Sequence, residues 1–224
     1  MQSYKREFIE FMLECEVLRF GDFTAKSGRK TPYFVNTGRY RTGAQLGRLA
    51  RFYAQVLQTE LGSSFDVLFG PAYKGIPLAA ATALQLHAEF DHDVAFCFNR
   101  KEAKDHGEGG TLIGHTLRDG DRVVIIEDVT TAGTSVRETV PLLRAAANVT
   151  LTALVVSVDR MERGSGEASA LREIRETYGM RTLSIVTVDE IIEHLRTTPV
   201  NGRMLLDDAL YQRLLEYRRT YGAN

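Results

Sequence analysis

Apolar residues recur along the chain in two spacings, which separate predicted helices from predicted strands. Near the amino end, Phe8, Met12 and Cys15 recur at helical spacing and predict a helix over residues 3–16. The same periodicity predicts further helices at residues 46–57, 76–86, 134–147, 167–178, 191–195 and 204–221. Short apolar runs predict strands at residues 67–69, 94–98, 122–126, 151–158 and 182–186.

The alternation of these strands and helices predicts the fold class. Strands separated by helices of this length require βαβ crossovers, so we expect an α/β fold with a mostly parallel twisted sheet and helices on both faces. At 224 residues, the chain is expected to form a single domain. Residues 20–40 contain aromatic and β-branched residues broken by a basic turn at 27–30, which predicts short strands that cover a site.

Composition narrows the class of protein. A hydrophobic fraction of 44% with 25% charged residues is typical of a globular chain. The net charge of -1 excludes an overall basic field for nucleic acid, so any anion site must be local. Cys15 and Cys97 form no disulfide framework, and no stretch is typical of a signal peptide or a membrane span. We therefore expect a cytoplasmic protein that binds neither nucleic acid nor membrane.

One loop combines the features of a site for a phosphorylated ribose. An apolar run at 123–126 is followed by Glu127 and Asp128, then by a turn rich in hydroxyl groups that contains Gly133. The two carboxylates can accept hydrogen bonds from vicinal sugar hydroxyls at the carboxyl end of a buried strand. The backbone N–H groups of the turn can bind a phosphate at the start of the next helix. The alternative is an ordinary strand end followed by Thr134 and Ser135 as helix caps.

This loop resembles the 5-phosphoribosyl 1-diphosphate (PRPP) binding motif of the type I phosphoribosyltransferases. Four more strings carry a closer resemblance to the bacterial orotate phosphoribosyltransferases: FTAKSGRKTPYF at 23–34, FGPAYKGIP at 69–77, FNRKEAKDHGEG at 98–109 and DRMERG at 159–164. The likeness extends almost from the first predicted helix to the last. Several long ordered strings in one chain make a far more specific signal than the ribose-phosphate loop alone.

The resemblance implies a reaction and a fold. It implies the type I phosphoribosyltransferase fold, with an N-terminal hood contributed mainly by residues 1–40 and a flexible flap at about residues 101–114. The implied reaction transfers the 5-phosphoribosyl group from PRPP to N1 of orotate, giving orotidine 5′-monophosphate and pyrophosphate in pyrimidine (UMP) biosynthesis. It also implies Mg²⁺ as cofactor, held mainly by PRPP and water rather than by direct protein ligands. The flap is expected to reach the neighbouring subunit's site, which makes a homodimer the working unit.

Site residues follow from the same matches, position by position. The residues expected to bind PRPP are Lys26, Tyr73, Lys74, Arg100, Lys101, Lys104, His106, Glu127, Asp128, Val129, Thr130, Thr131, Ala132, Gly133, Thr134 and Ser135. Those expected to bind orotate are Lys26, Phe34, Val35, Thr131 and Arg160. Those expected to take part in catalysis are Lys104, His106, Glu127 and Asp128. The donors at positions 100, 101, 104 and 106 suit the charge that grows on departing pyrophosphate.

Some of these residues allow another interpretation, and three positions differ from the pattern that is usual in the family. The flap could be a solvated basic loop, and Arg160 could form a surface salt bridge with Glu162. Ala25 stands where a larger aliphatic is common, Val35 where a second aromatic is frequent, and Glu127 where an aspartate is usual. A purine phosphoribosyltransferase, or a regulator that binds nucleic acid on the same fold, would share the ribose-phosphate loop.

Overall fold

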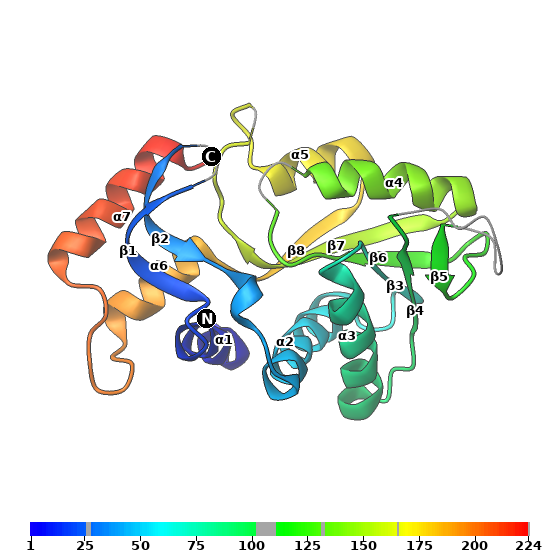
Figure 1. The fold of residues 1–224 in the computed structure, drawn as a ribbon, viewed down its shortest axis with the longest axis horizontal. Helices are drawn as coiled ribbons and strands as arrows, with labels where there is room; N and C mark the ends of the chain where they lie inside the picture. The colour runs from blue at the N-terminus through cyan, green and yellow to red at the C-terminus, as the bar shows by residue number, and fades with distance from the viewer. Residues whose placement is uncertain (26–27, 102–110, 131–132, 165, 224) are drawn as a thin grey trace.

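A six-stranded sheet forms the centre of the computed structural model, which describes residues 1–25, 28–101, 111–130, 133–164 and 166–223 (Figure 1). The strands are β3 (Val67–Gly70), β4 (Ala95–Asn99), β5 (Leu112–Gly114), β6 (Arg122–Ile126), β7 (Thr150–Asp159) and β8 (Arg181–Thr187). Their order across the sheet is β5-β4-β3-β6-β7-β8, and every pairing except β4 with β5 is parallel. The prediction of a mostly parallel α/β sheet is confirmed.

Helices cover both faces of this sheet. They are α1 (Ser3–Glu14), α2 (Gly43–Leu61), α3 (Gly75–Phe90), α4 (Thr134–Ala146), α5 (Ala170–Tyr178), α6 (Val188–Thr197) and α7 (Asp208–Tyr221). One hydrophobic core lies on the α4 and α5 face, and a larger one joins the other face to the remaining helices. Along β6, Val124 and Ile126 enter the larger core while Val123 and Ile125 enter the smaller one. Because both faces are buried, this strand is apolar throughout instead of alternating.

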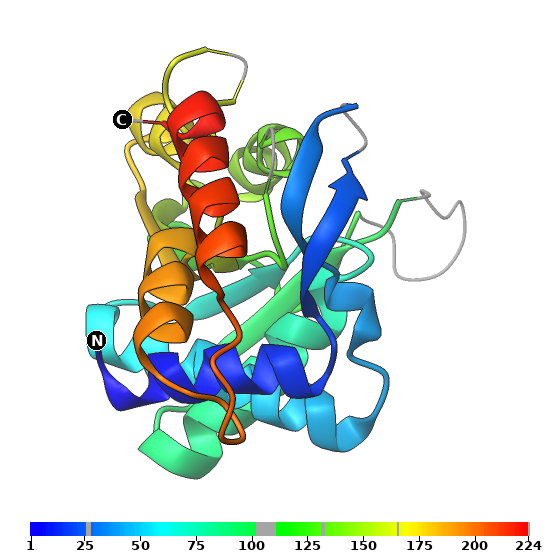
Figure 2. The ribbon, with the colours of Figure 1, turned by 90° about the vertical axis from the view of Figure 1, so that its left-hand side faces the viewer.

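A separate two-stranded antiparallel hairpin, β1 (Leu18–Thr24) with β2 (Lys30–Val35), stands beside α7 (Figure 2). The short 3-10 helix η1 (Thr37–Arg39) leads from β2 into α2. Tyr33 on β2 meets Tyr217 on α7 edge to face, with ring centroids 5.9 Å apart. The amino-terminal hairpin is therefore held against the carboxyl-terminal helix.

The structure corrects several predicted boundaries. Residues 112–114, expected to belong to the flap, form the edge strand β5, in which Leu112 and Ile113 pair with Asn99 and Phe98. A strand of three residues is too short to show a periodicity, and its pairing partner lies elsewhere in the sequence. The helix expected from residue 167 begins at Ala170 because Ser169 caps it. The last helix begins at Asp208 rather than residue 204, after the cap at Asp207.

Two glycines allow β3 to turn directly into α3. A Cβ placed on Gly70 would lie 2.1 Å from the backbone oxygen of Gly75, and one on Gly75 would lie 2.7 Å from the carbonyl carbon of Gly70. The backbone N–H of Gly75 donates to the oxygen of Pro71 at 2.9 Å, which closes the turn. No side chain fits between these backbones, so the position of the loop after β3 depends on both glycines.

We predict that Gly70→Ala lowers the free energy of unfolding by about 2–3 kcal/mol, because the new methyl group must push the β3–α3 turn apart. Gly47→Ala is the matched control: Gly47 lies inside α2 with nothing within 4 Å of an added Cβ. It should raise the free energy of unfolding by roughly 0.5–1 kcal/mol through helix propensity. Urea unfolding measures both changes, and equal effects of the two substitutions would contradict the close approach at Gly70.

Candidate functional site

The carboxyl ends of β3 and β6 meet at a switch point in the sheet. These neighbouring strands are followed by helices on opposite faces, α3 in the larger core and α4 in the smaller one. The chain leaves them in opposite directions across the sheet, toward β4 and toward β7. Open α/β sheets bind ligands in the crevice at such a point. The loops that follow these two strands carry Tyr73 and Lys74 on one side and Glu127 and Asp128 on the other.

The backbone of the acidic pair is fixed by buried neighbours. The N–H of Glu127 donates to the oxygen of Val155 at 3.0 Å, and the Tyr53 hydroxyl donates to the oxygen of Glu127 at 2.6 Å. The oxygen of Asp128 accepts from both the N–H and the hydroxyl of Ser157, at 2.9 and 2.6 Å. Tyr53 and Ser157 are buried, so the two carboxylates project from a rigid base.

The carboxylate of Asp128 is the centre of a three-residue network. Its Oδ2 accepts from Lys74 Nζ at 2.7 Å and from Thr37 Oγ1 at 2.6 Å. Lys74 Nζ also lies 3.3 Å from Thr37 Oγ1. The Lys74 side chain is 66% exposed and that of Asp128 is 13% exposed, so the pair links a partly buried acid to a solvent-facing cation. Both site residues were predicted from the sequence, and the contact between them comes from the fold.

Glu127 has a more enclosed environment than its neighbour. Burial raises the pKa of Glu127 from 4.5 to about 7; the hydrogen bond from Ser135 and the charge of Lys74 oppose this shift, and the charge of Asp128 adds to it. The Ser135 hydroxyl donates to Oε1 of Glu127 across one turn of the loop. The longer side chain noted as a departure from the usual aspartate is therefore held by a hydroxyl on α4.

The start of α4 supports the expected phosphate site. Gly133 occupies the N-cap position with a left-handed φ of 68°, and no side chain caps the helix. The alternative in which Thr134 and Ser135 are the caps is wrong, since both lie inside the helix. The Gly133 N–H donates to Thr130 Oγ1 at 3.1 Å, which folds the loop back on itself. A helix start without a side-chain cap presents N–H donors to an anion.

The residues after β4 lie against the loop after β3. Asn99 Oδ1 accepts from the N–H of Ala72 at 2.8 Å and so supports the backbone beside Tyr73. Lys101 Nζ lies 5.3 Å from the centroid of the exposed Tyr73 ring. The N–H of Arg100 donates to the oxygen of Thr111, where β5 returns beside β4. The expected PRPP-binding residues at this edge of the sheet are Tyr73 after β3, and Arg100 and Lys101 after β4. Asp128, after β6, lies at the same edge.

On the nucleobase side, the expected residues come from β2 and from the segment after β7. Phe34 stacks on Phe23 with ring centroids 5.5 Å apart, and Val35 packs against the larger core. Arg160 follows β7 and pairs with Glu162, Nη2 to Oε1, at 2.7 Å. The alternative of a salt bridge is thus observed, but their side chains are only 15% and 14% exposed, so the pair does not lie on the surface.

Five expected site residues lie outside the described residues, namely Lys26, Lys104, His106, Thr131 and Ala132. Two residues that sequence reasoning missed, Thr37 and Asn99, contact the site directly or support its loops. Asn99 stands within one of the strings that carry the family resemblance, and that was the available signal. Thr37 had no such signal, because nothing local links it to an aspartate 91 residues away.

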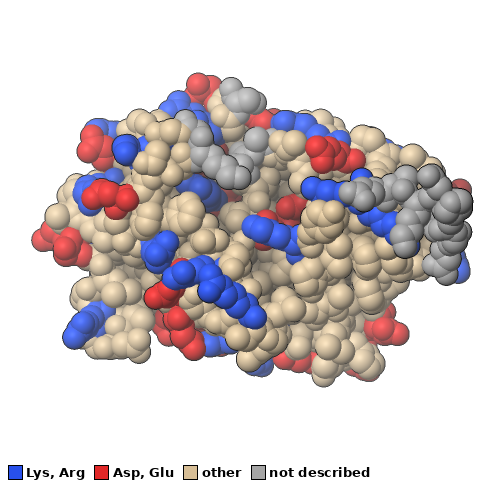
Figure 3. All heavy atoms as spheres, in the orientation of Figure 1, with Lys and Arg blue, Asp and Glu red and all other residues tan. Residues whose placement is uncertain are grey.

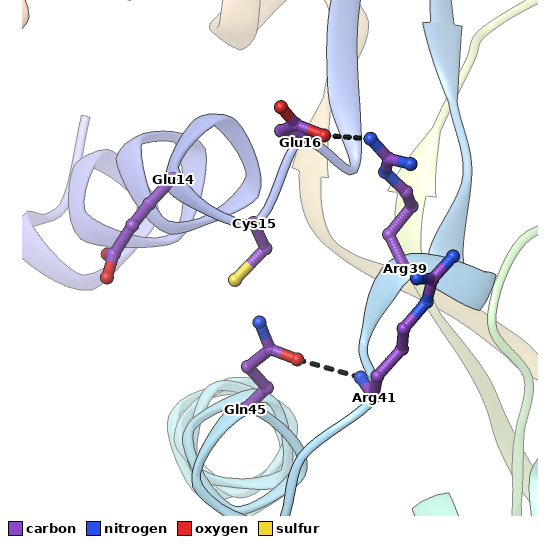
Figure 4. Close-up of a pocket in the computed structure, with 6 residues that line it drawn as sticks. All are labelled: Glu14, Cys15, Glu16, Arg39, Arg41 and Gln45. Atoms are coloured by element: carbon purple, nitrogen blue, oxygen red, sulfur yellow. Dashed lines mark hydrogen bonds and ion pairs between the residues drawn. The ribbon is translucent and has the colours of Figure 1, made fainter.

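Acidic and basic side chains lie together in a hollow between the hairpin side and the α4 side of the molecule (Figure 3). A different cavity, of about 400 Å³, lies between the end of α1 and the start of α2 (Figure 4). Its lining residues are Glu14, Cys15, Glu16, Arg39, Arg41 and Gln45. Arg39 is paired with Glu16 there, and the N–H of Arg41 donates to Gln45 at 2.7 Å. Among the residues that the structure describes, none of those expected to bind PRPP or orotate lines this cavity.

The chain is similar to known proteins in both sequence and fold. A family model described as phosphoribosyl transferase domain matches residues 39–194. The chain is 60% identical to the orotate phosphoribosyltransferase of Lachnoclostridium phytofermentans over 99% of each chain, and 57% identical to that of Clostridium beijerinckii over the full length of both. Its fold matches the crystal structure of orotate phosphoribosyltransferase from Francisella tularensis with a TM-score of 0.86 and 37% identity, covering 97% of this chain and 100% of the other.

The raised pKa of Glu127 predicts a pH-dependent stability. The unfolded chain releases this proton near pH 4.5 and the folded protein near pH 7, so the folded state binds more protons between those values. Stability contributed by the protonated Glu127 is therefore present below pH 4.5 and lost as pH rises through about 7. Relative to Glu127→Gln, the wild type should lose up to about 3 kcal/mol across this window.

Urea unfolding of both proteins in steps from about pH 5 to about pH 7.5 measures the difference. Glu167→Gln is the matched control, because the Glu167 side chain is 92% exposed. A difference between wild type and Glu127→Gln that stays constant with pH would show that Glu127 titrates at its ordinary value.

Proposed function

The chain belongs to the orotate phosphoribosyltransferases of the phosphoribosyl transferase family, and we propose that the loops at the carboxyl edge of its sheet bind PRPP and orotate. It is a transferase that moves the 5-phosphoribosyl group from PRPP to N1 of orotate in pyrimidine biosynthesis, giving orotidine 5′-monophosphate and pyrophosphate. The site assignment rests on the contact between Lys74 and Asp128, whose Nζ and Oδ2 atoms are 2.7 Å apart at the switch point between β3 and β6.

The ribose and its 5-phosphate are proposed to bind the loop after β6. Asp128 and Glu127 would accept hydrogen bonds from the two ribose hydroxyls, and the turn from Val129 to Ser135 would hold the phosphate at the start of α4. The absence of a side-chain cap at Gly133, among the residues described, supports this placement. Thr37 would keep Asp128 oriented when Lys74 leaves that carboxylate for a phosphate oxygen, since it donates to the same Oδ2.

The diphosphate is proposed to bind the loops after β3 and β4. Lys74 and the backbone beside Tyr73 would meet the diphosphate first, with Arg100 and Lys101 on the adjoining strand. Lys104 and His106 would add donors as the C1–O bond breaks and negative charge grows on pyrophosphate. Stabilising the leaving polyanion next to a cationic sugar is an electrostatic task, and preorganised donors accomplish it most effectively where water is excluded.

Orotate is proposed to bind between the hairpin and the segment after β7. Phe34 and the backbone of Val35 would line the flat ring, and Arg160 would make a two-point contact with a carboxylate or a ring amide. Lys26 and Thr131 would complete this side. The partly buried position of Arg160 supports the proposal, because its guanidinium is already oriented by neighbours and loses little freedom on binding.

Mg²⁺ is the cofactor we propose, held mainly by diphosphate oxygens and water. Within the described residues, no three His, Cys, Asp or Glu side chains form a group that could hold a metal ion. Asp128 accepts from Lys74 and Thr37, and Glu127 accepts from Ser135, so both carboxylates already have partners and no direct protein ligand to the metal is proposed. Magnesium keeps several waters and binds substrate phosphates in such sites, where it neutralises their charge.

A homodimer is the proposed working unit, with the flap of one subunit over the site of the other. Supporting this, α3 presents Pro77, Ala81, Leu84 and Ala88 along one outward side, and Leu84 is 64% exposed. The adjacent strand β4 adds Phe96, which is 38% exposed and paired with Leu68, so that it faces the α3 side of the sheet. An exposed apolar surface of this kind is typical of a protein interface, and it adjoins the start of the flap.

Two further assignments accompany this proposal. The whole chain, residues 1–224, is proposed to act as one phosphoribosyltransferase domain in the cytoplasm, with residues 1–40 as its hood. Among the described helices, none is both long enough and apolar enough to cross a membrane.

The acceptor base tests the activity directly. We predict that the absorbance of orotate changes on mixing with enzyme, PRPP and Mg²⁺, whereas hypoxanthine, adenine and uracil are not consumed. Asp128→Asn should reduce kcat/KM for PRPP roughly 10- to 100-fold, because the ribose loses a charged acceptor. Asp208→Asn, at a side chain that is 88% exposed, is the matched control. Turnover of a purine would overturn the base-site assignment, and PRPP binding without turnover of any base would favour a regulator.

The dimer proposal is tested at Leu84. Leu84→Glu places a charge in the proposed interface and should give a monomer by sedimentation, with turnover reduced at least about tenfold while PRPP still binds. Turnover should fall because Lys104 and His106 would no longer reach the partner's site. Leu215→Glu is the matched control, since Leu215 is 41% exposed on α7, away from α3. A fully active monomer would contradict both the interface and the shared flap.

A further inference from the structure

One oxygen of Glu162 accepts hydrogen bonds from three different parts of the chain. Oε1 receives the Tyr33 hydroxyl at 2.7 Å and the Tyr217 hydroxyl at 3.0 Å. It also receives Nε and Nη2 of Arg160, at 3.1 and 2.7 Å. Tyr33 belongs to β2 and Tyr217 to α7, so this carboxylate joins the hairpin, the segment after β7 and the carboxyl-terminal helix.

The donors that surround Glu162 are fixed in place. Tyr33 and Tyr217 are buried, with 1% and 6% of their surfaces exposed. Burial raises the pKa of both phenols, so each hydroxyl keeps its proton and acts as a donor. The Arg160 guanidinium also lies over the Tyr33 ring, 5.2 Å from its centroid.

The backbone around Glu162 is held by the end of the chain. The oxygen of Met161 accepts from Arg218 Nη1 and from the N–H of Ala223, each at 2.8 Å. The N–H of Arg163 donates to the oxygen of Tyr221 at 2.9 Å. The position of Glu162 is therefore set by α7 and the residues after it, which lie far along the chain from the proposed PRPP loops.

This arrangement decides which edge of the Arg160 guanidinium remains for a substrate. Glu162 takes the edge formed by Nε and Nη2, and within the described residues Nη1 has no hydrogen-bond partner. The end of the guanidinium, where Nη1 and the second hydrogen of Nη2 point the same way, can still make two parallel hydrogen bonds. That end matches a carboxylate or the paired amide and carbonyl of a pyrimidine ring.

We propose that Glu162 is a positioning residue for the base site: with Tyr33 and Tyr217 it fixes one edge of Arg160 so that the other edge meets orotate. This rests on the proposed contact of Arg160 with orotate. The carboxylate neutralises Arg160, so it contributes orientation rather than attraction for an anionic base. Its effect should therefore appear in the binding of orotate and leave the binding of PRPP unchanged.

Glu162→Gln separates orientation from packing because it keeps the size of the side chain. A neutral amide oxygen accepts hydrogen bonds more weakly than a carboxylate oxygen, and the amide group brings two donors in place of the second oxygen. The four hydrogen bonds to this position should therefore weaken, and Arg160 should be held less firmly. We expect KM for orotate to rise roughly tenfold, with kcat and KM for PRPP within about twofold of wild type. Glu167→Gln, an exposed carboxylate on the same segment, should change none of these constants.

Tyr217→Phe is a second variant that removes one donor and keeps the ring contact with Tyr33. KM for orotate should rise roughly two- to fivefold, which would link the carboxyl-terminal helix to base binding. If Glu162→Gln does not fold, as judged by circular dichroism, this variant decides the matter. An unchanged or lower KM for orotate in the folded variants would overturn the proposal.

Arg160→Lys distinguishes failure of this inference from failure of the proposed base site. If Arg160→Lys leaves KM for orotate unchanged, the assignment of Arg160 to orotate is wrong and the inference falls with it. If Arg160→Lys raises KM and Glu162→Gln does not, only the inference is overturned. In the Arg160→Lys background, Glu162→Gln should add less than about twofold, because it acts through the arginine. Additive effects of the two changes would also overturn it.

Discussion

Two neighbouring parallel strands deliver a lysine and an aspartate to the same edge of the sheet, and the 2.7 Å contact between Lys74 and Asp128 depends on that geometry. Parallel pairing places the carboxyl ends of β3, β4, β6 and β7 on one side, so the loops after these strands converge there. The helices after β3 and β6 turn to opposite faces, which leaves the space between these loops for a ligand. This one arrangement brings together the acidic pair, the loop after β3 that carries Lys74, and the start of α4.

The same constraint explains why the site combines rigid and exposed parts. Asp128 and Glu127 extend from backbone held by the buried Tyr53 and Ser157, which gives their carboxylates fixed positions. Lys74 is mostly exposed and can exchange a carboxylate for a phosphate at small cost, since an ion pair with an exposed cation contributes little to stability. Glu127 differs from Lys74 because it is largely enclosed. Its burial raises the pKa of that carboxyl toward neutrality.

A second group of polar contacts joins the hairpin to the last helix. The hairpin is not part of the main sheet, and one of its links to the rest of the molecule passes through Tyr33, Glu162 and Tyr217. Placing one carboxylate between two phenols and an arginine lets the hairpin and α7 share a polar contact that is largely closed to solvent. A buried polar cluster is favourable only when its members satisfy one another, so the loss of one member affects the others. This gives the end of the chain a physical connection to the predicted base side.

The sequence by itself determined the order of the helices and of the parallel strands, the mostly parallel sheet and the loop from Glu127 to Ser135, but not the edge strand β5. These depend on local periodicity and on residues adjacent in the chain, which is the information that a single sequence contains. Only the tertiary structure decided that Thr37 and Lys74 share Asp128, that Asn99 supports the loop after β3, and that Tyr33 and Tyr217 meet on Glu162. Their partners are separated by 27 to 129 residues, and no local pattern specifies such contacts. They arise because packing the hairpin, the sheet and the last helix around shared cores brings distant polar groups to the same point.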